Sequence, residues 1–228
     1  MIKTLFDRLD SWRHLPNYQL ERRADVFFSL YLQHVLQSRL GFEISPVIIP
    51  EFPVRIGTIY PHIDIDKSYK VDYACFSADK KTVVFVELKT EGQSRRKSQD
   101  KYLLASCAID FSALIEGVIK IFQATQSKHK YFYLLSELAH AGFLTIPAEM
   151  CEAIQNDRLL DIRVIVDNIR ILKCPQKSKI IYIQPNGEGP DTISFEEFKA
   201  AVDTYDDPVS KRFGQSLEEW STVKAGHK

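Results

Sequence analysis

The chain has 228 residues, 45% of them hydrophobic, and its 30 basic residues balance 30 acidic ones, as in a globular domain with a substantial core. This neutral charge disfavours a dedicated nucleic-acid-binding protein but leaves room for a local basic groove. The four cysteines and six histidines form no metal-binding or CxxC pattern, and the lack of a signal peptide or long apolar stretch predicts a cytoplasmic protein without a membrane segment.

Two helices are expected before any strand. Met1–His14 has the spacing of a short amphipathic helix, and Tyr18–Leu40 has that of a long helix that ends at Gly41. Glu21 borders the buried stripe of the second helix instead of facing water. It either belongs to a functional site, complements the dipole at the start of the helix, or pairs with Arg23 or an adjacent strand.

The strands are expected next. Val47–Ile49 is extended but surrounded by prolines, which favours an edge position in a sheet, and Arg55–Asp66 is expected to add a further strand. The clearest strands are Val71–Phe76 and Val83–Val86, joined by a turn at Ala78–Lys81. The second of these has no polar residue, as expected of a strand that is covered on both faces.

Charged side chains are predicted to meet at the end of this hairpin. Glu87 and Lys89 are two residues apart and therefore share one face of the strand. If Ser77 pairs with Thr82, Asp72 lies opposite Glu87 with Cβ atoms roughly 5 Å apart. Two carboxylates this close repel, and Mg²⁺, which prefers oxygen ligands, would relieve the repulsion. The alternative is an exposed Asp72 and an ordinary surface ion pair between Glu87 and Lys89.

The spacing of these residues resembles a known nuclease signature. Asp72 is followed, after fourteen residues, by Glu-Leu-Lys at 87–89, which resembles the motif of the PD-(D/E)xK superfamily. The resemblance covers about Asn17–Glu137, and one departure is Val71, which stands where the motif has proline. It implies a restriction endonuclease-like α/β fold, with a mixed central sheet flanked by helices in the order αβββαβ.

The resemblance also implies a role for each residue of the motif. Asp72 and Glu87, together with the Leu88 carbonyl, would bind Mg²⁺ or Mn²⁺. Lys89 would act on the attacking water or on the phosphate, and Glu21 would assist as the acid of the first core helix. The implied reaction is cleavage of nucleic acid, with DNA favoured over RNA.

A polar and basic segment follows the motif. Its candidate nucleic-acid-binding residues are Arg95, Arg96, Lys97, Gln99 and Lys101. The basic side chains would contact the phosphate backbone near a helix start, or they simply form a solvated first turn. Gln99 and Tyr102 are similar to the QxxxY element of RecB-type nucleases, with one residue fewer between them. Tyr102 is expected to contribute packing.

Further elements are expected toward the C-terminus. Tyr102–Gln126 is predicted to be a core helix and Lys130–Leu135 the strand that completes the αβββαβ order. A short helix is predicted at Pro147–Gln155, and strands at Ile162–Leu172 and Lys179–Gln184.

The last part of the chain carries a helix-start signal and a helical apolar stripe. Ser194 and Glu197 have the spacing of a capping box. Phe213, Leu217 and Trp220 recur at helical spacing, so this segment either packs back on the body of the protein or serves a homodimer.

The sequence therefore predicts a single α/β domain over residues 1–228, with a nuclease-like core at about 17–137 and a C-terminal elaboration at about 138–228. The predicted function is a metal-dependent nuclease, that is, a hydrolase of phosphodiester bonds. The alternative is a catalytically inactive nuclease-like module that binds nucleic acid or a protein partner.

Overall fold

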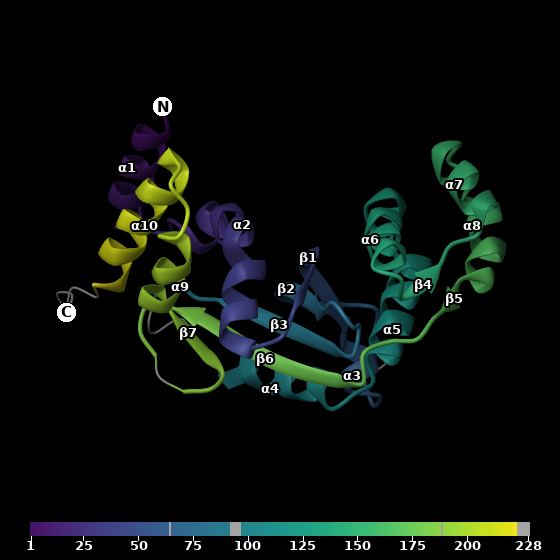
Figure 1. Ribbon diagram of the computed structural model, residues 1–228. Helices are drawn as coiled ribbons and strands as arrows, with labels where there is room; N and C mark the ends of the chain where they lie inside the picture. The colour runs from purple at the N-terminus through teal and green to yellow at the C-terminus, as the bar shows by residue number, and fades with distance from the viewer. Residues whose placement is uncertain (64, 92–96, 188, 223–228) are drawn as a thin grey trace. The chain divides into compact units, whose positions relative to one another are not determined.

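The computed structural model describes residues 1–63, 65–91, 97–187 and 189–222 (Figure 1). Its helices are α1 (Ile2–Trp12), α2 (Leu20–Leu40), α3 (Ile56–Ile59), α4 (Lys97–Cys107), α5 (Phe111–Ala124), α6 (Lys128–His140), α7 (Ala148–Gln155), α8 (Leu159–Ile165), the 3₁₀ helix η1 (Val166–Asn168), α9 (Phe195–Val202) and α10 (Pro208–Ser221). Its strands are β1 (Ile44–Arg55), β2 (Ser68–Ser77), β3 (Thr82–Leu88), β4 (Leu144–Thr145), β5 (Arg170–Ile171), β6 (Lys177–Gln184) and β7 (Thr192–Ser194).

The main sheet has the strand order β1-β2-β3-β6-β7. Strand β6 runs parallel to β7, with Tyr182 opposite Thr192, whereas β2 and β3 form a hairpin around a four-residue loop, so the sheet is mixed. Helices flank it, which confirms the predicted α/β class with a mixed central sheet. The proline-rich strand β1 is at an edge of the sheet, as expected, because proline cannot donate to a central ladder.

The chain divides into two compact units, each assembled from segments far apart in the sequence. Unit 1 comprises Met1–Pro46, Val86–Asp100 and Ile180–Lys228. Unit 2 comprises Val47–Phe85 and Lys101–Lys179.

Unit 1 is held together by aromatic packing among α2, α9 and α10. The ring of Phe28 lies 5.0 Å from that of Phe198 and 5.2 Å from that of Phe213, and Trp220 completes the cluster. Helix α10 lies beside α1 and α9 (Figure 1). Its stripe of Phe213, Leu217 and Trp220 is buried, so this segment packs on the body of the protein.

Local signals fix the ends of the last two helices. Ser194 accepts a hydrogen bond from the Glu197 amide, and the Glu197 carboxylate accepts one from the Ser194 amide, which confirms the predicted capping box. Asp207 plays the equivalent role at α10 by accepting bonds from the amides of Val209 and Ser210.

Unit 2 is centred on Phe111, the first residue of α5. Its ring lies 5.7 Å from Phe52 of β1 and 5.5 Å from both Phe76 of β2 and Phe143. Because Phe52 and Phe76 come from the neighbouring strands β1 and β2, α5 covers the part of the sheet that belongs to this unit.

Two predicted strands are helical instead. Lys130–Leu135 lies within α6, where Leu135 and Leu138 are buried at helical spacing, so packing overrides the strand propensity of its aromatic residues. Ile162–Leu172 forms α8 and η1, and only its end is the short strand β5. Ile162 and Val166 are buried one helical turn apart while Val164 between them is 72% exposed, which is a helical pattern. The next strand of the main sheet after α4, α5 and α6 is β6.

The predicted strand at Arg55–Asp66 is also wrong. The segment begins with α3, and the Ile56 amide donates to the Lys67 carbonyl at 2.9 Å. The cause is the buried Arg55 guanidinium, which pairs with Asp66 at 2.7 Å and draws the segment into a loop. A Cβ at Gly57 would lie 2.3 Å from that guanidinium, so only glycine fits there.

The predicted helix at Tyr102–Gln126 is divided into α4 and α5, which meet at a bend of 111°. The bend lets each helix bury its own apolar face. In the described part of the chain, no single helix has the length and hydropathy to cross a membrane, and α4 and α5 reach those limits only when joined across their bend.

Candidate functional site

The candidate site is built at the end of β3, in unit 1. Every residue of β3 is buried, which confirms the expectation of a strand covered on both faces. Glu87 is 0% exposed and Lys89, directly after the strand, is 4% exposed. The Lys89 amide donates to the Ile183 carbonyl of β6 at 2.7 Å, which continues the strand through the charged residues. Two buried charges at this position are costly unless each is paired.

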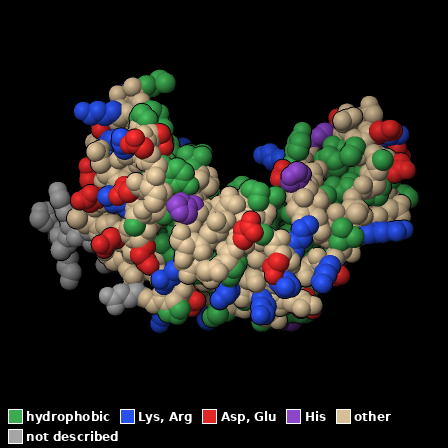
Figure 2. All heavy atoms as spheres, in the orientation of Figure 1, with side chains coloured by type: hydrophobic (Ala, Val, Ile, Leu, Met, Phe, Trp, Pro, Cys, Tyr) green, Lys and Arg blue, Asp and Glu red, His purple; other side chains and the backbone are tan. Residues whose placement is uncertain are grey.

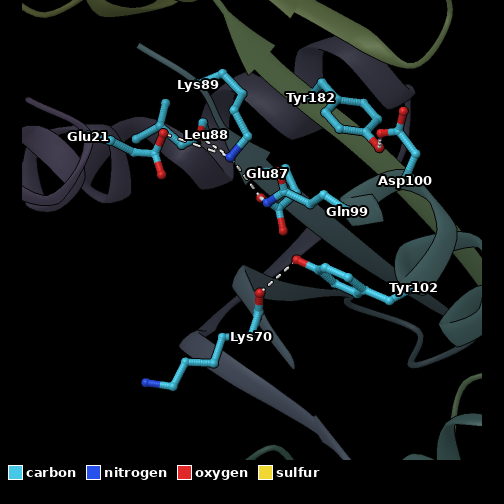
Figure 3. A network of polar contacts seen from close by, with 9 residues as sticks. All are labelled: Glu21, Lys70, Glu87, Leu88, Lys89, Gln99, Asp100, Tyr102 and Tyr182. Atoms are coloured by element: carbon cyan, nitrogen blue, oxygen red, sulfur yellow. Dashed lines mark hydrogen bonds and ion pairs between the residues drawn. The ribbon is translucent and has the colours of Figure 1, made fainter. Parts of the chain in front are cut away.

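The Lys89 ammonium is bound by oxygens from three residues (Figure 3). Its Nζ donates to Glu87 Oε2 at 3.1 Å and to the Leu88 carbonyl at 2.9 Å. Glu21 of α2 contributes its Oε2 at 3.8 Å. The structure therefore places Glu21 beside Glu87 and Lys89 and excludes the alternative in which Glu87 and Lys89 form an exposed surface pair.

Helix α4 supplies a neutral partner to the same carboxylate. Gln99 Nε2 donates to Glu87 Oε2 at 2.5 Å, so this oxygen accepts hydrogen bonds from both Gln99 and Lys89 (Figure 3). Gln99, predicted as a nucleic-acid contact and as part of an element similar to QxxxY, thus contacts the candidate site directly.

The hydrogen bond between α4 and β6 is not predicted from the sequence. The hydroxyl of Tyr182 donates to Asp100 Oδ1 at 2.6 Å, one residue from Gln99 (Figure 3). The available signals are the place of Asp100 next to Gln99 and the single tyrosine in the apolar part of β6. This bond anchors the first turn of α4 to β6, next to the residue that bonds Glu87.

The oxygen atoms around Lys89 have the chemistry of a hard-cation site. A carboxylate of Glu87, the carbonyl of Leu88 and a carboxylate of Glu21 already surround one positive charge, the ammonium. Mg²⁺ and Mn²⁺ favour such oxygen ligands, commonly one or two carboxylates with water. Among the described residues, no three His, Cys, Asp or Glu side chains gather closely enough to hold a metal ion. A metal held by Glu87 and the Leu88 carbonyl would need water or phosphate oxygens to complete its coordination.

Asp72 lies in β2 and is half buried within unit 2. The loop between β2 and β3 has the predicted length, and the Thr82 amide donates to Ser77 Oγ at 2.9 Å across it. Near the start of β2, the Tyr102 hydroxyl donates to the Lys70 carbonyl at 2.9 Å (Figure 3). The rings of Tyr102 and Tyr69 stack at 4.5 Å, which confirms that Tyr102 contributes packing.

The remaining candidates belong to the basic segment. Lys97 and Lys101 are exposed on α4 and are free of the buried network around Glu87. Arg95 and Arg96 lie outside the described residues.

Comparisons with protein-family models, with curated proteins and with solved structures returned no match.

Proposed function

We propose that this chain is a metal-dependent nuclease with a restriction endonuclease-like core, which hydrolyses phosphodiester bonds in nucleic acid, DNA in preference to RNA. The observation that carries the proposal is the buried pair of Glu87 and Lys89 at the end of β3, with the partly exposed Glu21 of α2 beside Lys89 and Gln99 on the Glu87 carboxylate. Replacing such a pair by apolar residues is often neutral or stabilising, so stability alone is a weak reason for its presence.

Each residue of the site has a distinct part in the proposal. Glu87 and the Leu88 carbonyl hold the metal, and Asp72 joins them on the grounds of the sequence motif alone. When bound, Mg²⁺ or Mn²⁺ would activate water and neutralise charge on the phosphate. Lys89 orients the attacking water or offsets the charge that grows on the phosphate oxygens. Glu21 keeps the Lys89 ammonium in place.

Gln99 has a positioning part. By donating to Glu87 Oε2, it fixes the rotamer of the carboxylate that would hold the cation. Lys97 and Lys101 lie on the same helix and would contact the phosphate backbone. Arg95 and Arg96, from the basic segment that follows the motif, would do the same.

One observation favours a second candidate, a nuclease-like module that binds nucleic acid or a protein partner without cleaving. The Lys89 ammonium is already satisfied by Glu87, Leu88 and Glu21, so the network is complete without any ligand. The cleavage experiment separates the two candidates.

The test compares wild type with Lys89→Ala and Glu21→Gln on linear duplex, supercoiled plasmid, single-stranded DNA and RNA, with Mg²⁺ or Mn²⁺. We expect cleavage by wild type, its loss in Lys89→Ala and a reduced rate in Glu21→Gln. Circular dichroism verifies the fold of each variant. The matched control is Lys211→Ala, which removes an exposed lysine of α10 in the same unit. Full cleavage by a folded Lys89→Ala protein would overturn the proposed site.

A further inference from the structure

Aromatic and arginine side chains gather where α1 approaches the start of α2, in unit 1. A hollow of about 350 Å³ and a second hollow of about 440 Å³ share Tyr18 and Arg23. We call their lining the α1–α2 surface, and its aromatic and arginine residues are Arg8, Trp12, Tyr18, Arg22, Arg23 and Phe27. Met1, Leu5 and Leu9 add apolar side chains to the first hollow. Hydrophobic side chains are visible at the molecular surface over α2 in Figure 2.

Trp12 is the most informative residue of this surface. It is 43% exposed, whereas the other tryptophan of the chain, Trp220, is 0% exposed. Its ring meets that of Tyr18 at 6.2 Å in an edge-to-face arrangement, and the Arg8 guanidinium lies 5.6 Å from its centroid. The Leu15 amide donates to the Trp12 carbonyl at 2.8 Å, which fixes the turn after α1. The indole is therefore held in place while a large part of it faces solvent.

The charge of the α1–α2 surface is positive although the whole chain is neutral. The acids of α1, Asp7 and Asp10, are bound by Arg212 of α10. Among the described residues, no carboxylate forms an ion pair with Arg8, Arg22 or Arg23. Exposed arginines beside aromatic rings complement a polyanion that carries planar groups, and they do not complement an apolar partner helix.

We propose that the α1–α2 surface binds single-stranded nucleic acid, with an unpaired base on Trp12 and phosphates at Arg22 and Arg23. Stacking requires an open base face, which a single strand offers and a duplex hides. Arg22 follows Glu21 in α2, and the Glu21 carboxylate lies 3.8 Å from Lys89 Nζ in the candidate site. The inference rests on the proposed function in so far as it leads a strand toward Lys89.

The test measures tryptophan fluorescence of the full chain in EDTA while single-stranded oligothymidine is added. Because Trp220 is fully buried, quenching by a stacked base reports on Trp12. We expect quenching in wild type, no quenching in Trp12→Phe, and binding weakened by roughly tenfold in Trp12→Ala, measured by anisotropy of labelled oligothymidine.

The arginines are tested by the salt dependence of the same binding. Loss of two phosphate contacts in the double variant Arg22→Gln with Arg23→Gln should lower the slope of log affinity against log salt by about 1.4. The matched control, Lys211→Gln on α10, should keep the wild-type slope. Equal slopes in the double variant and the control would overturn the inference.

Other occupants give distinct results. Anionic phospholipid vesicles that quench Trp12 while oligothymidine does not would assign the surface to lipid and overturn the inference. Quenching by oligothymidine together with no cleavage in Mg²⁺ would support the inference and contradict the proposed nuclease. Cleavage of single strands without quenching of Trp12 would support the nuclease and overturn the inference.

Discussion

Glu87 and Lys89 are charged and buried, so their desolvation is costly unless other groups replace the lost water. Lys89 loses its hydration but donates hydrogen bonds to Glu87 and the Leu88 carbonyl and forms an ion pair with Glu21. Glu87 accepts hydrogen bonds from Lys89 and Gln99. Removing one member leaves the other as a buried charge without its partner, whereas replacing both by apolar residues leaves no buried charge. The energetic signature of this pair is therefore non-additivity.

We predict that Glu87→Ala lowers the free energy of unfolding by about 3–5 kcal/mol, because Lys89 is then buried without its carboxylate. The double variant Glu87→Leu with Lys89→Met should recover most of this loss and should not cleave nucleic acid. Urea unfolding measures both. A double variant whose losses simply add would contradict the picture of a mutually dependent pair.

The cysteines are predicted to differ in reactivity. Burial raises the pKa of the Cys75 thiol far above its ordinary value and that of Cys107 and Cys174 to about 11, whereas Cys151 is exposed. Since the thiolate is the reactive form, Cys151 should react with a thiol reagent at pH 8 in the native protein, and Cys75 only after unfolding. Mass spectrometry of labelled peptides identifies the site. Rapid native labelling of Cys75 would contradict its burial.

At the scale of elements, α10 begins at a carboxylate cap whose strength depends on pH. Hydrogen bonds from the Ser210 hydroxyl and from the Ser210 and Val209 amides lower the pKa of Asp207 below its ordinary value of 3.8. A carboxylate with a lowered pKa stabilises the folded state above its unfolded-state pKa, and this contribution is lost as the pH falls through the folded-state pKa.

We therefore predict that Asp207→Ala lowers the melting temperature at pH 7. The difference from wild type should shrink below pH 3.8 and vanish once Asp207 is protonated in the folded state. Thermal melts followed by circular dichroism at several pH values measure it. Asp206→Ala is the control, since Asp206 is 95% exposed and pairs with Lys211 at the surface. An equal effect of both substitutions would argue against a cap.

The elements that sequence predicts well are those with local and redundant signals. Three features can each be predicted from a few neighbouring residues: the buried run of β3, the capping box at Ser194 and the apolar stripe of α10. The same holds for the Glu87–Lys89 pair, because β3 fixes the shared face. Contacts between distant segments, such as Tyr182 with Asp100, leave no such local trace.

The failed predictions arise where two periodicities compete. Aromatic and β-branched residues favour a strand in Lys130–Leu135 and in Ile162–Leu172, yet both segments bury residues one helical turn apart. At Arg55–Asp66 the loop follows the ion pair of a buried arginine with Asp66. The local sequence does not indicate which arginine will be buried.

At the scale of the whole molecule, metal binding should be visible as stability. A ligand that binds only the folded state at ten times its dissociation constant raises the free energy of unfolding by about 1.4 kcal/mol. We predict that saturating Mg²⁺ raises the melting temperature of wild type and that EDTA reverses the rise. Glu87→Gln should remove the effect, and Glu196→Gln, an exposed acid of the same unit, should retain it. An unchanged melting temperature in wild type would contradict the proposed metal role.

The ammonium that Glu87, Leu88 and Glu21 surround has a consequence for how tightly a metal is held. Lys89 is an internal competitor for the same oxygens, tethered to the chain and therefore present at a fixed, high effective concentration. In the proposed nuclease, a divalent ion would compete with this ammonium for the oxygens of Glu87 and Leu88, so its affinity would lie below what these ligands alone would give. Lys89→Ala should bind Mg²⁺ more tightly while it loses the power to cleave.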